Sequence, residues 1–126
     1  RPDTARSQLA ALAPVILAAA EDGDKVAAAL MVEGARQLAR MAAALVEPLD
    51  FGSDPISVVP AGGLLGHAAY LAAFRSALEK TGHPFRLVES PVPPIGGAAF
   101  LAADLAGITL TDEARRRIGV GAQAVL

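Results

Sequence analysis

The stretch Ile56-Ser-Val-Val-Pro-Ala-Gly-Gly-Leu-Leu-Gly-His67 decides how this chain folds. A short β-branched run ends on the paired glycines Gly62 and Gly63, and a helical pattern begins near Ala68. Glycine lacks a Cβ atom, so the backbone can approach a ligand there, and the next helix offers unpaired N–H groups. Ligands of open α/β sheets bind at this edge. The pattern predicts an α/β fold and a candidate nucleotide site, although plain turn chemistry produces the same corner.

Two helical patterns come before this stretch. The first covers residues 4–20, bends at Pro14, and is predicted to turn inward Leu9, Leu12, Ile16 and Ala19. The second follows Asp24, a residue able to cap a helix, and reaches about residue 46 before Pro48. Its predicted apolar face consists of Val26, Leu30, Leu38, Met41 and Leu45.

Strands and helices alternate in the rest of the chain. Ile56–Val59 is predicted as a strand buried on both faces, and Phe85–Glu89 as a second strand parallel to it. Between them, residues 68–80 form a helix with Leu71, Phe74 and Leu78 inward. Two strands are too few for a stable sheet. We therefore expect a small, incomplete parallel sheet that other chain segments or a second copy would complete.

The C-terminal third is predicted to hold two further helices. A turn at Gly96 and Gly97 leads into a compact helix over residues 98–105. Thr111 opens a last short helix, and from Gly119 onward we expect a loose tail. The sequence has no internal repeat or low-complexity linker, so residues 1–126 are treated as one unit.

Composition excludes several classes of function. The 126 residues are 53% hydrophobic and 19% charged, which is typical of a globular domain. A net charge of −2, without a basic face, argues against nucleic acid as a partner. The absence of cysteine excludes thiolate metal sites and fits a cytoplasmic location. No apolar run is long enough to cross a membrane. Because the chain begins without Met, we expect it to be part of a longer protein.

No complete catalytic constellation is visible. Asp22 and Asp24 lie between two helices, where a helix stop and an N-cap are expected more often than a metal site. His67 follows the glycines and is either a ligand contact or a polar first-turn residue. His83 is expected in a loop, and the arginines at 115–117 on a solvated helix end.

Four segments in this order carry a resemblance to a known family: Ala18–Asp24, Val58–Leu64, the helix from Ala68 to Leu78, and Pro93–Ala102. Together they resemble the C-terminal half of the BadF/BadG-type ATPase and N-acetylglucosamine kinase family, in the sugar kinase, Hsp70 and actin superfamily. The resemblance implies a ribonuclease H-like, actin-like ATPase fold, with residues 1–126 as its C-terminal nucleotide-binding part.

The resemblance also implies a set of binding residues. Gly62 and Gly63 would lie against the adenosine of ATP, Leu64 and Leu65 would flank the base or ribose, and Ala61 would add a backbone contact. Gly96 and Gly97 match a small-residue turn, for which close packing is the expected role. ATP and Mg²⁺ are the implied cofactors, with the metal held mainly by an N-terminal lobe upstream of Arg1.

The implied activity is phosphorylation of N-acetylglucosamine or glucosamine. The family's phosphate loops and catalytic aspartate do not occur in residues 1–126, so this segment alone is not expected to transfer phosphate. Two alternatives stay open. One is an activator ATPase, whose iron–sulfur ligands would have to lie upstream. The other is a non-enzymatic α/β interaction module, for which a homodimer is one form.

Overall fold

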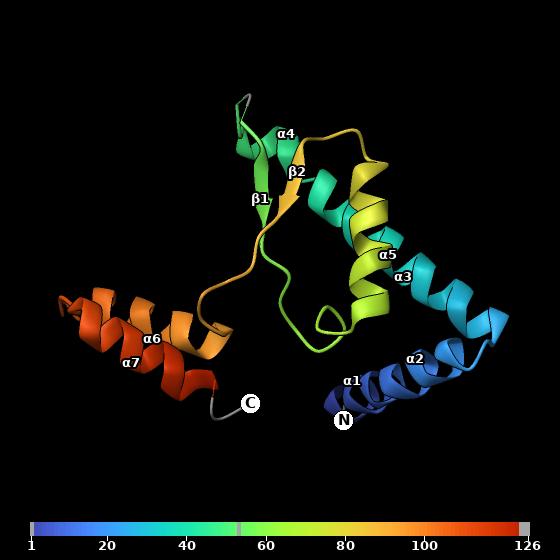
Figure 1. The fold of residues 1–126 in the computed structure, drawn as a ribbon, viewed down its shortest axis with the longest axis horizontal. Helices are drawn as coiled ribbons and strands as arrows, with labels where there is room; N and C mark the ends of the chain where they lie inside the picture. The colour runs from blue at the N-terminus through green and yellow to red at the C-terminus, as the bar shows by residue number, and fades with distance from the viewer. Residues whose placement is uncertain (1, 53, 124–126) are drawn as a thin grey trace. The chain divides into compact units, whose positions relative to one another are not determined.

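The computed structural model describes residues 2–52 and 54–123. In these residues, four helices come first, a strand–helix–strand segment follows, and two further helices end the chain (Figure 1). In order, the elements are α1 (Pro2–Ala11), α2 (Ala13–Glu21), α3 (Lys25–Ala43), α4 (Val46–Leu49), β1 (Ile56–Val58), α5 (Ala68–Glu79), β2 (Phe85–Leu87), α6 (Pro94–Leu105) and α7 (Asp112–Gln123).

The chain divides into two compact units. The first comprises residues 1–58 and 62–87, and the second comprises residues 59–61 and 88–126. This division differs from the single compact unit that the absence of a linker suggested. Of the predicted contact residues, Ala61 belongs to the second unit, and Gly62, Gly63, Leu64 and Leu65 belong to the first.

The first unit begins with two consecutive helices. The predicted bend is present: α1 ends at Ala11, α2 starts at Ala13, and Pro14 lies in the first turn of α2, where its missing N–H costs nothing. The predicted inward face is right only in part. Leu9 is 67% exposed and Leu12 is exposed as well, whereas Ile16 and Ala19 are half-buried and Leu17 is the buried residue of α2.

Asp24 caps α3, as predicted. Its Oδ1 atom accepts hydrogen bonds from the backbone N–H groups of Val26 at 2.8 Å and Ala27 at 2.9 Å. These bonds satisfy two of the donors that a helix N-terminus leaves free. The helix is shorter than predicted: α3 ends at Ala43, and Pro48 lies within the separate short helix α4.

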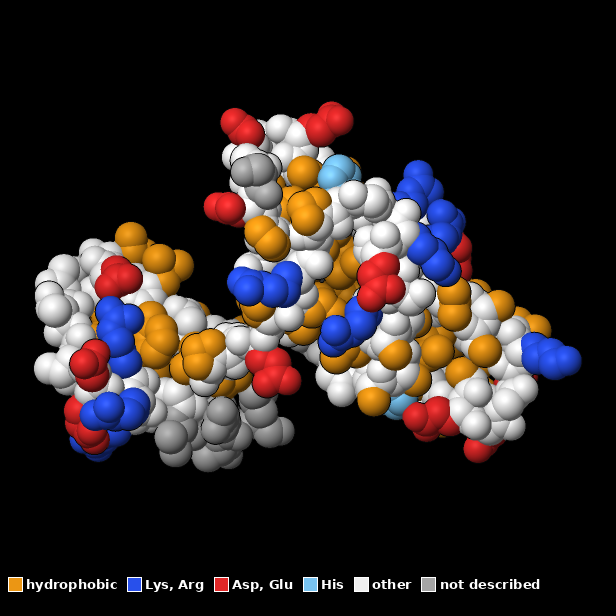
Figure 2. Space-filling model, turned by 45° about the horizontal axis from the view of Figure 1, so that its top comes forward, with side chains coloured by type: hydrophobic (Ala, Val, Ile, Leu, Met, Phe, Trp, Pro, Cys, Tyr) orange, Lys and Arg blue, Asp and Glu red, His pale blue; other side chains and the backbone are white. Residues whose placement is uncertain are grey.

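The predicted apolar face of α3 is also wrong. Val26 is 71% exposed, and Leu30, Met41 and Leu45 are exposed as well, whereas Leu38 is half-buried. The buried residues of α3 are Ala27, Ala35 and Ala39. These small side chains allow α5 to pack closely, and larger residues of α3 stay exposed. Hydrophobic side chains are visible on the molecular surface in Figure 2. Leu71 is half-buried, while Phe74 and Leu78 of α5 are buried, as predicted.

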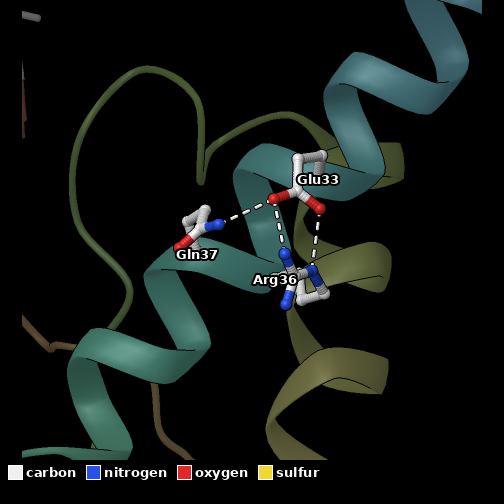
Figure 3. A network of polar contacts seen from close by, with 3 residues as sticks. All are labelled: Glu33, Arg36 and Gln37. Atoms are coloured by element: carbon white, nitrogen blue, oxygen red, sulfur yellow. Dashed lines mark hydrogen bonds and ion pairs between the residues drawn. The ribbon is translucent and has the colours of Figure 1, made fainter.

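The outward surface of α3 carries a small polar network (Figure 3). The guanidinium of Arg36 donates from Nε and Nη2 to the two carboxylate oxygens of Glu33, at 2.7 and 2.6 Å. Gln37 donates a third bond to Glu33 at 2.7 Å. These hydrogen bonds, that of Arg36 first, lower the pKa of Glu33 from 4.5 to about 2.

A hydrophobic core joins α2, α3 and α5. Its buried members are Leu17, Ala35, Ala39, Tyr70, Phe74 and Leu78. The helices α3 and α5 lie side by side (Figure 1). At the end of α5, the hydroxyl of Thr81 donates to the carbonyl of Leu78, and Gly82 adopts a positive φ of 80°, which matches the predicted stop.

The strands β1 and β2 form a two-stranded parallel sheet, as predicted. The register pairs Ile56 with Phe85 and Val58 with Leu87. Only one face is covered: Ile56 is buried, Ser57 is exposed and Val58 is half-buried. The prediction of burial on both faces is therefore wrong for these residues, because α5 packs against one side only.

The second unit holds α6 and α7, which pack together. The prediction of a turn at Gly96 and Gly97 is wrong. Pro94 already starts α6 ahead of them, because its fixed φ suits a first helical position. The loose tail from Gly119 is also wrong. The helix α7 runs to Gln123, and a Cβ atom on Gly119 would come within 2.9 Å of Val92, so close packing explains this glycine.

In the part of the chain that the structure describes, no helix combines the length and the apolar character needed to span a membrane.

Candidate functional site

The segment after β1 forms the tight turn that the sequence predicted. We call residues 62–66 the glycine corner. The N–H of Gly66 donates to the carbonyl of Gly62 at 3.1 Å, and the N–H of His67 donates to the carbonyl of Leu64 at 3.1 Å. The next residue, Ala68, begins α5. The corner thus connects the carboxyl end of a parallel strand to a helix N-terminus, the position at which open α/β sheets bind ligands.

The backbone conformation requires glycine at position 62 but not at position 63. Gly62 has a φ of +102°, a conformation that other residues rarely adopt, so the turn itself requires glycine there. Gly63 has no such requirement. A Cβ atom on Gly63 would meet no atom within 4 Å, so the space beside it is open. A ligand lying against the backbone can occupy that space.

The other three predicted contact residues differ in their surroundings. Leu64 is 40% exposed, which leaves its side chain free to meet a base or a ribose. Leu65 is half-buried and packs against the core of the first unit. Ala61 is exposed and belongs to the second unit. Within the first unit, the open surface of the corner is therefore formed by Gly63 and Leu64.

His67 is the N-cap residue of α5, but its side chain accepts no capping hydrogen bond. Its Nε2 atom lies 3.4 Å from Oε1 of Glu21 on α2, within ion-pair distance. Its Nδ1 atom is buried and has no hydrogen-bond partner. Sequence reasoning left His67 between a ligand contact and a first-turn residue, and it missed Glu21, because no local pattern joins two residues so far apart in the chain.

The described residues show no cluster of metal-binding side chains. Among residues 2–52 and 54–123, no group of three or more His, Asp or Glu side chains is placed to hold a metal ion. Asp24, for which the sequence favoured an N-cap over a metal ligand, uses its Oδ1 atom to cap α3.

A hollow lies at the end of α5 that is away from the glycine corner. It has a volume of about 400 Å³ and is lined by Arg75, Leu78, Glu79, His83, Phe85, Arg86 and Leu87. His83, expected as a loop residue, packs edge-to-face on Phe85 at 5.7 Å between ring centroids. Arg86 donates to the Ser57 hydroxyl at 3.3 Å. No motif in the sequence indicated this hollow.

Comparison with protein-family models gives one match. The model described as the BadF/BadG/BcrA/BcrD ATPase family matches residues 1–102. The matched region includes all of the first unit, the glycine corner and the first turns of α6. No curated protein and no solved structure matches the chain. The match confirms the predicted resemblance at the level of the family; the kinase branch and the C-terminal placement stay predictions.

Proposed function

Because the chain belongs to the BadF/BadG/BcrA/BcrD ATPase family, we propose that residues 1–126 are the ATP-binding C-terminal part of a sugar kinase that phosphorylates N-acetylglucosamine or glucosamine. The family implies an actin-like ATPase fold, and membership supports an ATPase or kinase-like role. The amino sugar as acceptor is the finer part of the proposal, and it rests on the order of motifs in the sequence.

One observation carries the proposal, namely the open glycine corner at the carboxyl end of β1. Gly63 presents bare backbone with no neighbouring atom where its side chain would be, and Leu64 offers an exposed apolar side chain beside it. This combination suits adenosine, since its flat base can pack on an apolar side chain and a glycine lets a ligand approach the backbone closely. In the proposal, Gly62 shapes the turn, and Gly63 and Leu64 line the nucleoside.

The proposal assigns the rest of the reaction to chain outside these residues. Mg²⁺, the phosphate-binding loops and the acceptor hydroxyl would be held by an N-terminal lobe, so residues 1–126 would bind nucleotide without transferring phosphate. We place the enzyme in the cytoplasm, as the cysteine-free sequence suggests. A homodimer stays a prediction.

An activator ATPase is the second candidate, and the family description favours it because it names ATPase activity without naming a sugar. Such proteins hold an iron–sulfur cluster through cysteine thiolates. Residues 1–126 contain no cysteine, so every ligand would have to come from elsewhere. A non-enzymatic interaction module would bind no nucleotide at all, so ATP-dependent activity of the complete protein would exclude it.

The experiment compares Gly63→Val with Gly97→Val in the complete protein. Both glycines have open space where a Cβ atom would lie, and neither has a positive φ, so neither substitution should disturb the fold. We expect Gly63→Val to raise the KM for ATP about tenfold by crowding the nucleoside, which equals about 1.4 kcal/mol of lost binding. Gly97→Val should leave it unchanged. Equal ATP dependence in the two variants would contradict the assignment.

The acceptor is tested by measuring ADP release over a panel of sugars. The proposal predicts that N-acetylglucosamine or glucosamine stimulates release more than neutral hexoses do. If no sugar stimulates ADP release while Gly63→Val still raises the KM for ATP, the activator ATPase becomes the preferred assignment.

A further inference from the structure

The two ring nitrogens of His67 have different surroundings. Nε2 faces the carboxylate of Glu21 at 3.4 Å, and Nδ1 is buried without a partner. A nitrogen that solvent cannot reach is also out of reach of a ligand. The ring is therefore poorly placed to contact a nucleotide, even though it directly follows the glycine corner.

The backbone of His67 joins the corner to α5. Its N–H donates to the carbonyl of Leu64 at 3.1 Å, and its own carbonyl accepts a bond from the N–H of Leu71 at 2.9 Å. A contact that restrains His67 therefore acts where the last turn of the corner meets the first turn of α5.

Glu21 contacts the ring of His67 from another helix. It is the last residue of α2, and α2 reaches α5 mainly through α3, on which both helices pack. The contact between Glu21 and His67 connects the end of α2 directly to the start of α5. The corner is otherwise attached to the helical layer through Leu65, which packs against the core, and through the packing of α5 on α3.

We propose that Glu21 and His67 form a positioning pair that fixes the glycine corner for the adenosine of ATP. This inference rests on the proposed function, because it gives the corner a ligand. Neither residue touches the nucleotide in this account, so the pair acts on ATP affinity and leaves the chemical step alone. Both side chains are partly exposed, His67 at 31% and Glu21 at 59%, so the effect should be modest, about two- to fivefold in the KM for ATP.

The experiment measures the KM for ATP, kcat and the unfolding temperature in the complete protein. The variants are Glu21→Ala, His67→Ala and the double variant, with Glu47→Ala as a matched control, since Glu47 is also an exposed glutamate at a helix. Each single variant should raise the KM for ATP about two- to fivefold at unchanged kcat. The double variant should raise it no further than one single variant does, because either change already breaks the pair. Glu47→Ala should change nothing.

Two rescue variants separate positioning from simple loss of stability. His67→Gln keeps a donor near the place of Nε2 and should retain most of the ATP affinity. The exchange Glu21→Lys with His67→Glu reverses the charges and should recover affinity relative to Glu21→Lys alone. If His67→Ala fails to fold, these two comparisons still test the pair.

The inference and the proposed function fail in different ways. Gly63→Val is run in the same assay. If it raises the KM for ATP while the pair variants do not, or if their effects simply multiply, the positioning pair is wrong and the nucleotide site stands. If Gly63→Val has no effect, the nucleotide site itself is wrong.

Discussion

A Cβ atom on Gly34 of α3 would lie 3.2 Å from the hydroxyl oxygen of Tyr70 on α5. Tyr70 is buried in the core of the first unit, and this burial raises the pKa of its hydroxyl. A glycine in the middle of α3 is unfavourable for the helix by itself. The nearby hydroxyl of Tyr70 accounts for it, because a Cβ atom at position 34 would crowd that oxygen, whereas the ring atoms stay at ordinary contact distance.

The first prediction uses this contact. Gly34→Ala gains about 1 kcal/mol of helix propensity but crowds the Tyr70 hydroxyl, so the free energy of unfolding should stay within about 1 kcal/mol of the original. In a Tyr70→Phe background the crowding oxygen is gone, and the same substitution should stabilise by about 1 kcal/mol. Urea denaturation of the four proteins checks this. An identical effect of Gly34→Ala in both backgrounds would show that the hydroxyl does not limit the packing.

The second prediction concerns the start of α3. Asp24→Ala removes the acceptor for the N–H groups of Val26 and Ala27 and should lower the free energy of unfolding by about 1 kcal/mol. Asp22→Ala is the matched control, because Asp22 is also an exposed aspartate in the same turn, and its side chain does not cap α3. Its effect should stay within about 0.5 kcal/mol. Equal losses in chemical denaturation would mean that charge, and not capping, matters here.

The third prediction separates the observed core from the one that the sequence suggested. Phe74 is 2% exposed, and Phe74→Ala should cost about 3–5 kcal/mol through lost burial and the cavity left behind. Val26 was expected inside but is exposed, so Val26→Ala should change stability by no more than about 0.5 kcal/mol. Thermal unfolding of residues 1–126 distinguishes the two faces. A large loss of stability in Val26→Ala would instead support the apolar face of α3 that the sequence predicted.

The fourth prediction is a titration. Because Arg36 and Gln37 donate hydrogen bonds to Glu33, its carboxyl should titrate with a pKa of about 2, well below 4.5. A lowered pKa means that the folded state favours the charged form, so any stabilisation is complete above pH 4.5 and is lost as the pH falls toward 2. The network is exposed, and its effect on stability should be small.

The measurement for Glu33 is carbon-detected NMR across the acid range. Arg36→Ala should raise the midpoint toward 4.5, and Gln37→Ala should raise it less, since Arg36 is the larger cause. A midpoint of Glu33 that does not move in Arg36→Ala would contradict the network of Figure 3.

The elements of this fold could be predicted where local chemistry sets them. Asp24 as a cap, Pro14 as a break and the glycine corner as a strand-to-helix turn are all properties of a few adjacent residues. The parallel pairing of β1 with β2 followed from the helix between them.

The core could not be predicted in the same way, because it depends on which faces meet. Spacing favoured the large side chains of α3, yet Ala35 and Ala39 face α5, since small residues let two helices approach closely. The end of α7 was missed for a similar reason: Gly119 lowers helix propensity, but its contact with Val92 needs a glycine. Glu21 beside His67 is a tertiary contact with no local signal.

The central claim is that the adenosine of ATP lies against Gly63 and Leu64, and photolabelling with 8-azido-ATP tests it most directly. The complete protein is irradiated with the probe, with and without excess ATP, and the labelled peptides are sequenced. We expect label within residues 61–65, protected by ATP and lost in Gly63→Val but kept in Gly97→Val. ATP-protected label that lies elsewhere in the protein, with none between residues 59 and 67, would contradict the account.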